Sequence, residues 1–220
     1  MKKFFVSLLA FSVFSGTLFA KQWTNNIGAG MSIPFSTIGV NKSGADDINQ
    51  LGYGVEGTYI GQHENGFMAK ANVSIGLATS RDISIQDRDT NIGVFENVAL
   101  GAGYSFVNTE RALFGLTGMF GVELGQYSLE EEKNSDSITT SLSLVTVSFG
   151  TDIFSVYRIS ERMGFFANLN ARWIIAGTAR REVTTESKSS GKKKQETDSS
   201  STDLLGKFIV QPSIGVIWSF

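Results

Sequence analysis

The chain has 220 residues, a formal net charge of −2 at pH 7 and a mean hydropathy of +0.01. Its length is enough for one domain, and without a basic excess there is no reason to expect a nucleic-acid partner. Because it has no cysteine, the chain can form neither disulfides nor thiolate metal sites, and it cannot carry a lipid-modified cysteine.

The first twenty residues have the pattern of a secretory signal peptide. Lys2 and Lys3 form a basic start, an apolar segment follows at 4–14, and Ala20 offers a small residue for cleavage. The apolar run is shorter than the roughly 18 residues that a membrane-spanning helix needs. We therefore expect residues 1–20 to be removed and residues 21–220 to form the mature domain. A transmembrane anchor is the alternative.

Four segments with alternating apolar and polar residues follow, at residues 22–35, 50–60, 67–77 and 92–106. In the third of these, Phe67 and Val73 share one phase while Lys70 and Asn72 share the other. A period of two residues predicts β-strands that each have one apolar and one polar face.

The second half of the chain contains four further strand-like segments, at residues 113–127, 138–154, 164–177 and 204–220. In the second of these, Leu142 and Leu144 fall on one phase, whereas Val145 and Val147 fall on the other. We therefore expect a β-bulge near Leu144–Val145.

Two connections in this half are long and polar. One follows residue 127 and contains Glu130, Glu131, Glu132 and Lys133. The other, segment 178–203, is rich in Ser, Thr and Lys and includes the run Lys192, Lys193 and Lys194. Neither has the apolar residues for a core of its own, so both are predicted to be loops, and the second a mobile one.

The final segment ends on an aromatic residue. Every second residue from Phe208 to Phe220 is apolar, and the residues between them are mostly small or polar. With Trp218 and Phe220 at its end, this pattern resembles the closing strand of bacterial outer-membrane β-barrels. The resemblance implies that Trp218 and Phe220 belong to the signal that the barrel-assembly machinery reads.

The eight predicted strands indicate a closed barrel. Eight is an even number, and each strand reaches the ~9–11 residues that a tilted strand needs to cross a bilayer. Long and short connections alternate, as outer loops and periplasmic turns do, and an open sheet edge is too costly in hydrocarbon. We predict an all-β fold, an eight-stranded antiparallel up-and-down transmembrane β-barrel, with both termini periplasmic and the loops extracellular. A soluble β-sandwich is the alternative.

Aromatic residues provide an independent argument for the barrel. Those placed next to the short turns and the termini are Trp23, Tyr59, Phe67, Tyr104, Phe106, Phe114, Tyr157, Phe165, Trp218 and Phe220. We expect them to gather at one membrane interface. Glu96 falls on the outward phase, so either a bulge resets the phase there or Glu96 lies at the upper interface.

The mature chain resembles the small eight-stranded outer-membrane proteins, namely the OmpA transmembrane domain, OmpX and OmpW. The resemblance implies a place in the bacterial outer membrane, with outer-membrane lipid and the barrel-assembly machinery as partners. The chain departs from full-length OmpA-type proteins because no peptidoglycan-binding domain follows the predicted barrel. We expect a monomer.

Four charged residues fall on the inward phase at mid-strand, namely Glu56, Lys70, Glu123 and Arg172. An eight-stranded barrel is just wide enough for side chains, so each charge needs a partner. We expect Glu56 to pair with Lys70 across neighbouring strands and Glu123 to lie near Arg172. The set resembles the charged interior of the OmpA transmembrane domain, which implies a blocked water path. It is interpreted either as a satisfied polar core or as a gate.

Few residues in the chain suggest chemistry. Acyl-transfer sites on small barrels need a histidine near the outer rim, but His63 falls in a short periplasmic turn. The acidic run Glu130–Glu132 is either a loose Ca²⁺ or bridging-cation site or a solvated loop tip. The lysine run at 192–194 either contacts anionic glycans or only keeps the loop soluble. We expect no enzyme activity, no cofactor and no metal.

Three functions remain open at this stage. The first is a surface protein whose loops meet a host or environmental ligand in adhesion, together with a structural role in the outer membrane. The second is an OmpW-like conduit for small apolar molecules, for which Ile174, Ile209, Val145 and Val147 could line the outer mouth. The third is an outer-membrane enzyme, which the missing rim histidine disfavours.

Overall fold

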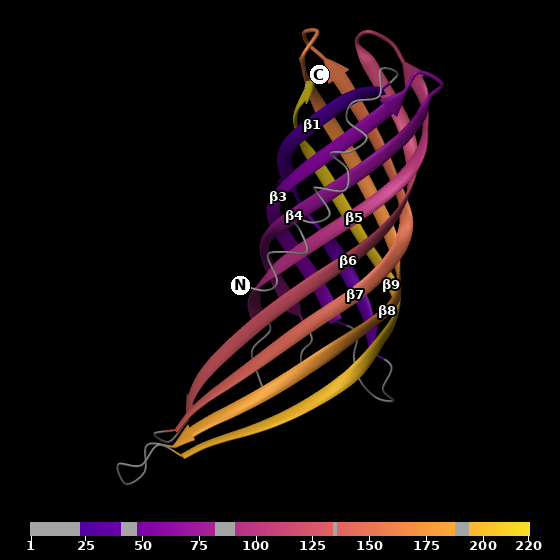
Figure 1. Ribbon diagram of the computed structural model, residues 1–220. Helices are drawn as coiled ribbons and strands as arrows, with labels where there is room; N and C mark the ends of the chain where they lie inside the picture. The colour runs from indigo at the N-terminus through magenta and orange to yellow at the C-terminus, as the bar shows by residue number, and fades with distance from the viewer. Residues whose placement is uncertain (1–22, 41–47, 82–90, 134–135, 188–193) are drawn as a thin grey trace.

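The computed structural model describes residues 23–40, 48–81, 91–133, 136–187 and 194–220 (Figure 1). The predicted signal peptide at 1–20 lies outside these residues. The described residues form strands β1 (Trp23–Ser32), β2 (Phe35–Val40), β3 (Ile48–His63), β4 (Phe67–Arg81), β5 (Asn91–Asn108), β6 (Ala112–Lys133), β7 (Asp136–Arg158), β8 (Met163–Ser187) and β9 (Lys194–Ser219). Within the described part of the chain, no helix is both long and apolar enough to cross a bilayer.

The nine strands occupy eight antiparallel positions in a closed ring, and each position is called a stave below. The first stave consists of β1 and β2 in succession, and both lie between β3 and β9. Pro34 separates the two strands because it has no N–H to donate, but its carbonyl still accepts a hydrogen bond from the Gly52 N–H at 2.8 Å. The pairings β1–β9 and β3–β4 complete the ring. The predicted all-β, eight-stranded antiparallel barrel is confirmed.

The register gives the barrel a steep strand tilt. A row of paired residues that starts on β4 and is followed around the wall returns to β4 ten residues farther along. That row runs through Lys70, Gly101, Met119, Gly150, Arg172, Ile209, Ser36, Gln50 and Ser80. Since strand tilt grows with this stagger, residues paired in one row lie at different heights around the barrel.

The outward face of the wall is apolar and exposed on every stave, as a lipid-facing surface must be. Its exposed side chains include Met31, Val55, Phe67, Leu77, Tyr104, Phe120, Phe149, Ile153, Phe165, Trp173, Ile214 and Trp218. Glu96 is exposed on this face, and its register with Ile75 and Leu124 is continuous. The β5 bulge considered at Glu96 is therefore absent, and the remaining interpretation is a position near the upper interface.

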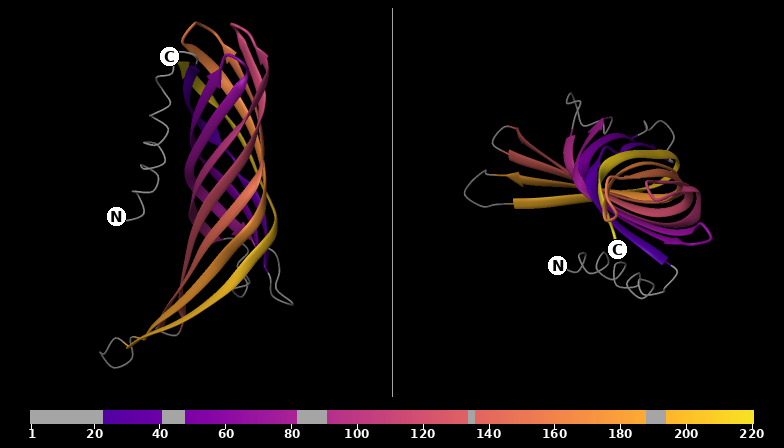
Figure 2. Two further views of the ribbon diagram at one scale, coloured as in Figure 1. Left: turned by 45° about the vertical axis from the view of Figure 1, so that its right-hand side comes forward. Right: turned by 90° about the horizontal axis from the view of Figure 1, so that it is seen from above.

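Two predicted loops are strands instead. β6 continues to Lys133, so Glu130–Glu132 pair with residues of β7, and β8 and β9 run through most of segment 178–203. Beyond Tyr127 of β6 and Leu204 of β9, these strands have no neighbour in the barrel wall. Residues 128–133, 136–141, 182–187 and 194–199 thus form a four-stranded sheet, called the arm below. Figure 2 shows the arm projecting sideways beyond the outline of the barrel.

The bulge expected near Leu144–Val145 is also absent. The β6–β7 register is continuous, with Leu144 buried and Val145 exposed, so both phases belong to one regular strand. The irregularity lies on the neighbouring stave, where Ile175 is inserted between two residues of β8 that pair with Val147 and Ser148. A β-bulge increases local twist and bends the strand. This bulge lies in the barrel wall, close to the base of the arm.

Deleting Phe220 is expected to reduce the amount of folded protein in the membrane severely. The Phe220 N–H donates to the Asn25 carbonyl at 2.9 Å, and the Phe220 carbonyl accepts from the Asn25 N–H at 3.3 Å. The deletion therefore removes two hydrogen bonds at the β1–β9 closure as well as the proposed assembly signal. Heat-modifiable mobility on gels measures the folded fraction. Wild-type folded levels would contradict the role of the terminal residue.

Candidate functional site

The barrel interior is filled in three layers. The layer nearest the short turns is an apolar cluster of Ile60, Met68, Leu113, Phe154, Val156, Phe166 and Ile217. The layer nearest the arm is a second apolar cluster of Ile38, Ala78, Phe95, Tyr127, Leu142, Leu144, Ile174, Ala179, Leu204 and Ile209. A polar layer with five buried charged side chains lies between them. The two apolar clusters lie on either side of this polar layer, and buried polar side chains such as Asn26 and Gln62 lie beside the first of them.

The shortest contact in the polar layer joins Lys70 of β4 to Asp152 of β7. Lys70 Nζ lies 2.5 Å from Asp152 Oδ1, and both side chains are fully buried. Asn170 donates its amide to the other carboxylate oxygen of Asp152 at 3.3 Å. The ammonium group also lies 4.9 Å from the centre of the Phe154 ring, within the range of a cation–π contact. This pair spans the lumen and fixes opposite walls to each other.

Glu56 of β3 accepts hydrogen bonds from neutral side chains of β8 and β9. Ser213 donates to Oε1 at 2.7 Å, Asn168 donates to the same oxygen at 3.1 Å, and Gln211 donates to Oε2 at 3.0 Å. Gln211 in turn accepts from Asn97 at 3.0 Å. Three neutral hydrogen-bond donors thus converge on the two oxygens of this buried carboxyl group.

Arg172 and Glu123 are buried without such bonds. Arg172 is 1% exposed, and none of its three guanidinium nitrogens has a hydrogen-bond partner in the structure. Glu123 attracts it electrostatically, but Oε2 of Glu123 also lacks a partner. The guanidinium lies against Gly121, so a side chain at that position would overlap Nη1. Arg172 therefore depends on the missing side chain of Gly121 for its space.

The structure places all four predicted lumen charges inside the barrel but changes their pairing. The register sets Glu56 opposite Ser74 and Lys70 opposite Ile60, so the expected cross-strand pair between Glu56 and Lys70 was wrong. Lys70 pairs instead with Asp152, which the sequence analysis missed. Asp152 shares its phase with Leu142 and Leu144, and that phase could have placed it inside. With Asp152 included, three buried acids face two buried bases among the described residues.

The other predicted site residues lie at the two ends of the molecule. Lys194 is the first residue of β9, whereas Lys192 and Lys193 lie outside the described residues. His63 ends β3 at the first short turn, where its Nδ1 accepts from the Asn65 N–H at 3.3 Å and its ring meets Trp23 edge-on at 5.4 Å. Trp218 is 43% exposed and Phe220 is 63% exposed at the same end.

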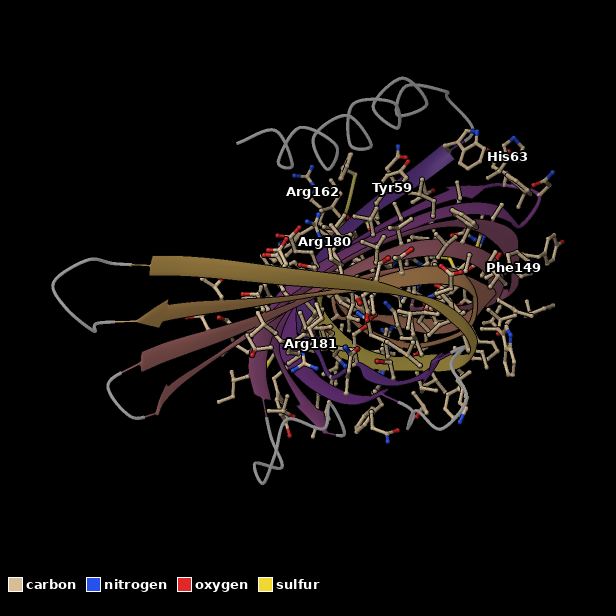
Figure 3. The ribbon with its side chains drawn as sticks, turned by 90° about the horizontal axis from the view of Figure 1, so that it is seen from below. Tyr59, His63, Phe149, Arg162, Arg180 and Arg181 are labelled. Carbon is tan, nitrogen blue, oxygen red and sulfur yellow. The ribbon has the colours of Figure 1, made fainter. Side chains whose placement is uncertain are left out.

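The base of the arm carries a second group of charged residues. Arg180 and Glu182 of β8 form an exposed ion pair with a distance of 2.7 Å between Nη2 and Oε1. Arg181, between them in sequence, points the other way because it pairs with inward-facing Leu142. Figure 3, in which both arginines are labelled, shows them where the arm joins the barrel. This ion pair at the arm base is therefore open to solvent.

Comparisons with known proteins give matches of structure only. No protein-family model and no curated protein matches the sequence. The outer membrane protein OprG from Pseudomonas aeruginosa is similar over 90% of this chain and 95% of its own, with 12% identity and a TM-score of 0.54. A major outer membrane protein from Thermus thermophilus is similar over 87% of this chain and 99% of its own, with 12% identity and a TM-score of 0.51.

A third structure, the attachment invasion locus protein Ail of Yersinia pestis in complex with the heparin analogue sucrose octasulfate, has 11% identity and a TM-score of 0.48. It covers 90% of this chain and 99% of its own. A TM-score of 0.48 is too low to compare the ligands of the two proteins. Together with the ring of eight staves and its apolar outer face, the two stronger matches lead to one conclusion. The chain has the fold of the small outer-membrane β-barrel proteins.

Proposed function

We propose that this chain is a non-enzymatic outer-membrane barrel that presents the arm at the cell surface for contact with a host or environmental ligand. The observation that carries the proposal is the contrast between a filled lumen and a paired, four-stranded extension of the wall. A rigid scaffold that carries an exposed extension is typical of binding proteins. A barrel whose lumen is closed at both ends offers no comparable site inside.

The proposed orientation follows from the two ends of the barrel. Three short turns, Trp23 and Phe220 lie at one end, and the arm lies at the other. Outer-membrane barrels have short periplasmic turns and longer extracellular segments. Both ends of the mature chain are therefore proposed to be periplasmic, and residues 1–20 are proposed to be the signal peptide that delivers it. The arm is then extracellular.

The absence of enzyme activity remains part of the proposal. His63 is the single histidine of the chain and lies in a turn at the proposed periplasmic end, away from the arm. A hydrolase that uses a histidine base would need that residue beside a nucleophile near the substrate. This position supports a binding role over acyl-transfer chemistry.

The test of a closed lumen is the conductance of refolded residues 21–220 in planar bilayers. We expect silence from samples that show the heat-modifiable, folded band. The two apolar clusters leave the polar layer without a continuous water path to either end, so no ion current is expected. Steady small openings would contradict a closed barrel and direct attention to Glu56, Lys70, Glu123 and Arg172.

The test of the arm is its removal without damage to the barrel. Residues 130–139 and 183–198 are each replaced by an Asn-Gly turn, which joins the paired residues on either side by a two-residue hairpin. Cells that display this variant are expected to keep a folded barrel and to lose attachment to host cells or matrix proteins that wild-type cells bind. Equal attachment by both would contradict the proposed role of the arm.

A conduit for small apolar molecules is the second candidate. Ile174 and Ile209 face the interior in the apolar cluster nearest the arm, where that function needs apolar side chains. Val145 is exposed on the lipid-facing side, and Val147 is on the same phase, so neither lines the lumen. Saturable binding of an apolar fluorescent probe that is lost in an Ile174→Asn variant would favour this candidate over the closed barrel.

Deleting Lys192–Lys194 is expected to leave the heat-modifiable mobility unchanged. Lys194 pairs with Ser187 at the far end of the arm, so its removal shortens the arm but breaks no contact in the barrel. The folded and heated forms are compared on gels, with the Phe220 deletion as the positive control for lost folding. A loss of the folded band would show that the tip is required for the barrel.

A further inference from the structure

The outward face of β6–β9 changes from aromatic to polar within three cross-strand rows. Phe120, Phe149, Trp173 and Phe208 are paired in one row, and each is about half exposed. Farther toward the arm, the exposed residues Gln126, Ser143, Arg180 and Ser201 form another row on the same face. Ser128 and Ser141 continue this face as the first row of the arm.

This change marks the level at which the outward face leaves the hydrocarbon. Aromatic side chains favour the membrane interface, and polar side chains are tolerated above it. The face that contacts lipid tails at Phe149 must therefore contact the head-group zone at Ser143, because both residues point outward from the same strand. The arm also projects sideways beyond the outline of the barrel (Figure 2), so it overlies neighbouring lipid rather than only the barrel mouth.

The chemistry of this face favours a carbohydrate partner. Its polar side chains are hydroxyls, one amide and the carboxylates of Asp203 and Glu182, and Arg180 is already paired with Glu182 at 2.7 Å. A hydroxyl can donate and accept, as sugar hydroxyls do, whereas an arginine neutralised by a carboxylate is a weaker ligand for phosphate. We propose that the outward face at the base of the arm binds the saccharide part of the outer-leaflet lipopolysaccharide. This inference rests on the outer-membrane location in the proposed function.

The experiment compares two glycolipids and two matched variants. The folded protein in phosphatidylglycerol nanodiscs is titrated with lipopolysaccharide that has a complete core oligosaccharide, and separately with lipid A alone. We expect the complete form to bind about three- to tenfold more tightly, because each hydrogen bond to sugar adds up to about 1 kcal/mol. Ser141→Val with Ser143→Val is expected to abolish this preference. Valine suits a strand, so the barrel is expected to fold.

The matched control is Thr151→Val with Ser155→Val, which removes two hydroxyls from the same face of β7 but at levels within the apolar belt. It is expected to keep the preference of the wild type. Equal binding of the two glycolipids by a folded wild-type barrel, or equal loss in both variants, would overturn the inference and leave the barrel assignment intact. Failure to obtain a heat-modifiable band in any bilayer would instead count against the proposed function.

Discussion

Replacing Lys70 with methionine is expected to destabilise the folded barrel by about 3–5 kcal/mol, the cost typical of breaking a buried ion pair from one side. Lys70 and Asp152 are both fully buried, and their 2.5 Å contact is the only ion pair that Asp152 makes among the described residues. After the substitution, Asp152 keeps one hydrogen bond from Asn170. The loss comes from a carboxylate left in a low-dielectric interior without its counter-charge.

The double variant Lys70→Met with Asp152→Leu separates this mechanism from simple loss of packing. Because both charges are removed together, no group is left unpaired, and most of the lost stability is expected to return. Urea titrations in lipid vesicles, followed by tryptophan fluorescence and the folded gel band, give the free energy of unfolding. Glu96→Gln on the exposed outer face is the control and should change it by less than about 0.5 kcal/mol. A double variant as unstable as Lys70→Met would point to packing instead.

The strands of the barrel could be predicted from the sequence because each has one buried and one lipid-facing side. This asymmetry produces a period of two that is visible in segments such as 67–77, and it also sets the phase on which Glu56, Lys70 and Arg172 lie. The extent of the strands could not be predicted in the same way. In the arm, residues such as Thr139 and Thr184 belong to a sheet outside the barrel wall, so no burial pattern marks them as strand. Their β-structure rests on backbone pairing with neighbouring strands.

The partners of the lumen charges were harder to predict for a geometric reason. Strand neighbours follow from chain order, but contacts across the lumen depend on the tilt and stagger of the closed ring. Lys70 and Asp152 are three staves apart and meet only because the wall curves round. The undecided phase of segment 138–154 also kept Asp152 out of the predicted interior. Gly121 shows the same limit, because its importance comes from Arg172, a residue two staves away.

Replacing Gly121 with alanine is expected to destabilise the barrel by about 1–3 kcal/mol, the range for overpacking a filled interior. The new Cβ would overlap Arg172 Nη1. Arg172 is 1% exposed, and the apolar cluster nearest the arm lies next to the polar layer that contains it. The guanidinium must therefore move within the closed interior. Glu123, which attracts Arg172, is the next inward residue of β6 after Gly121.

Gly118→Ala supplies the matched control on the same strand. Gly118 faces outward, and the nearest atom to an added Cβ is the Ala102 carbonyl oxygen at 3.9 Å, an ordinary contact distance. Since alanine costs less chain entropy than glycine on folding, this variant should be as stable as the wild type or up to about 1 kcal/mol more stable. Measured side by side, the free energy of unfolding should thus be lower than that of the wild type for Gly121→Ala and equal or higher for Gly118→Ala. If Gly121→Ala matched Gly118→Ala, the guanidinium of Arg172 would not be held against β6, and the closed polar layer would have room to rearrange.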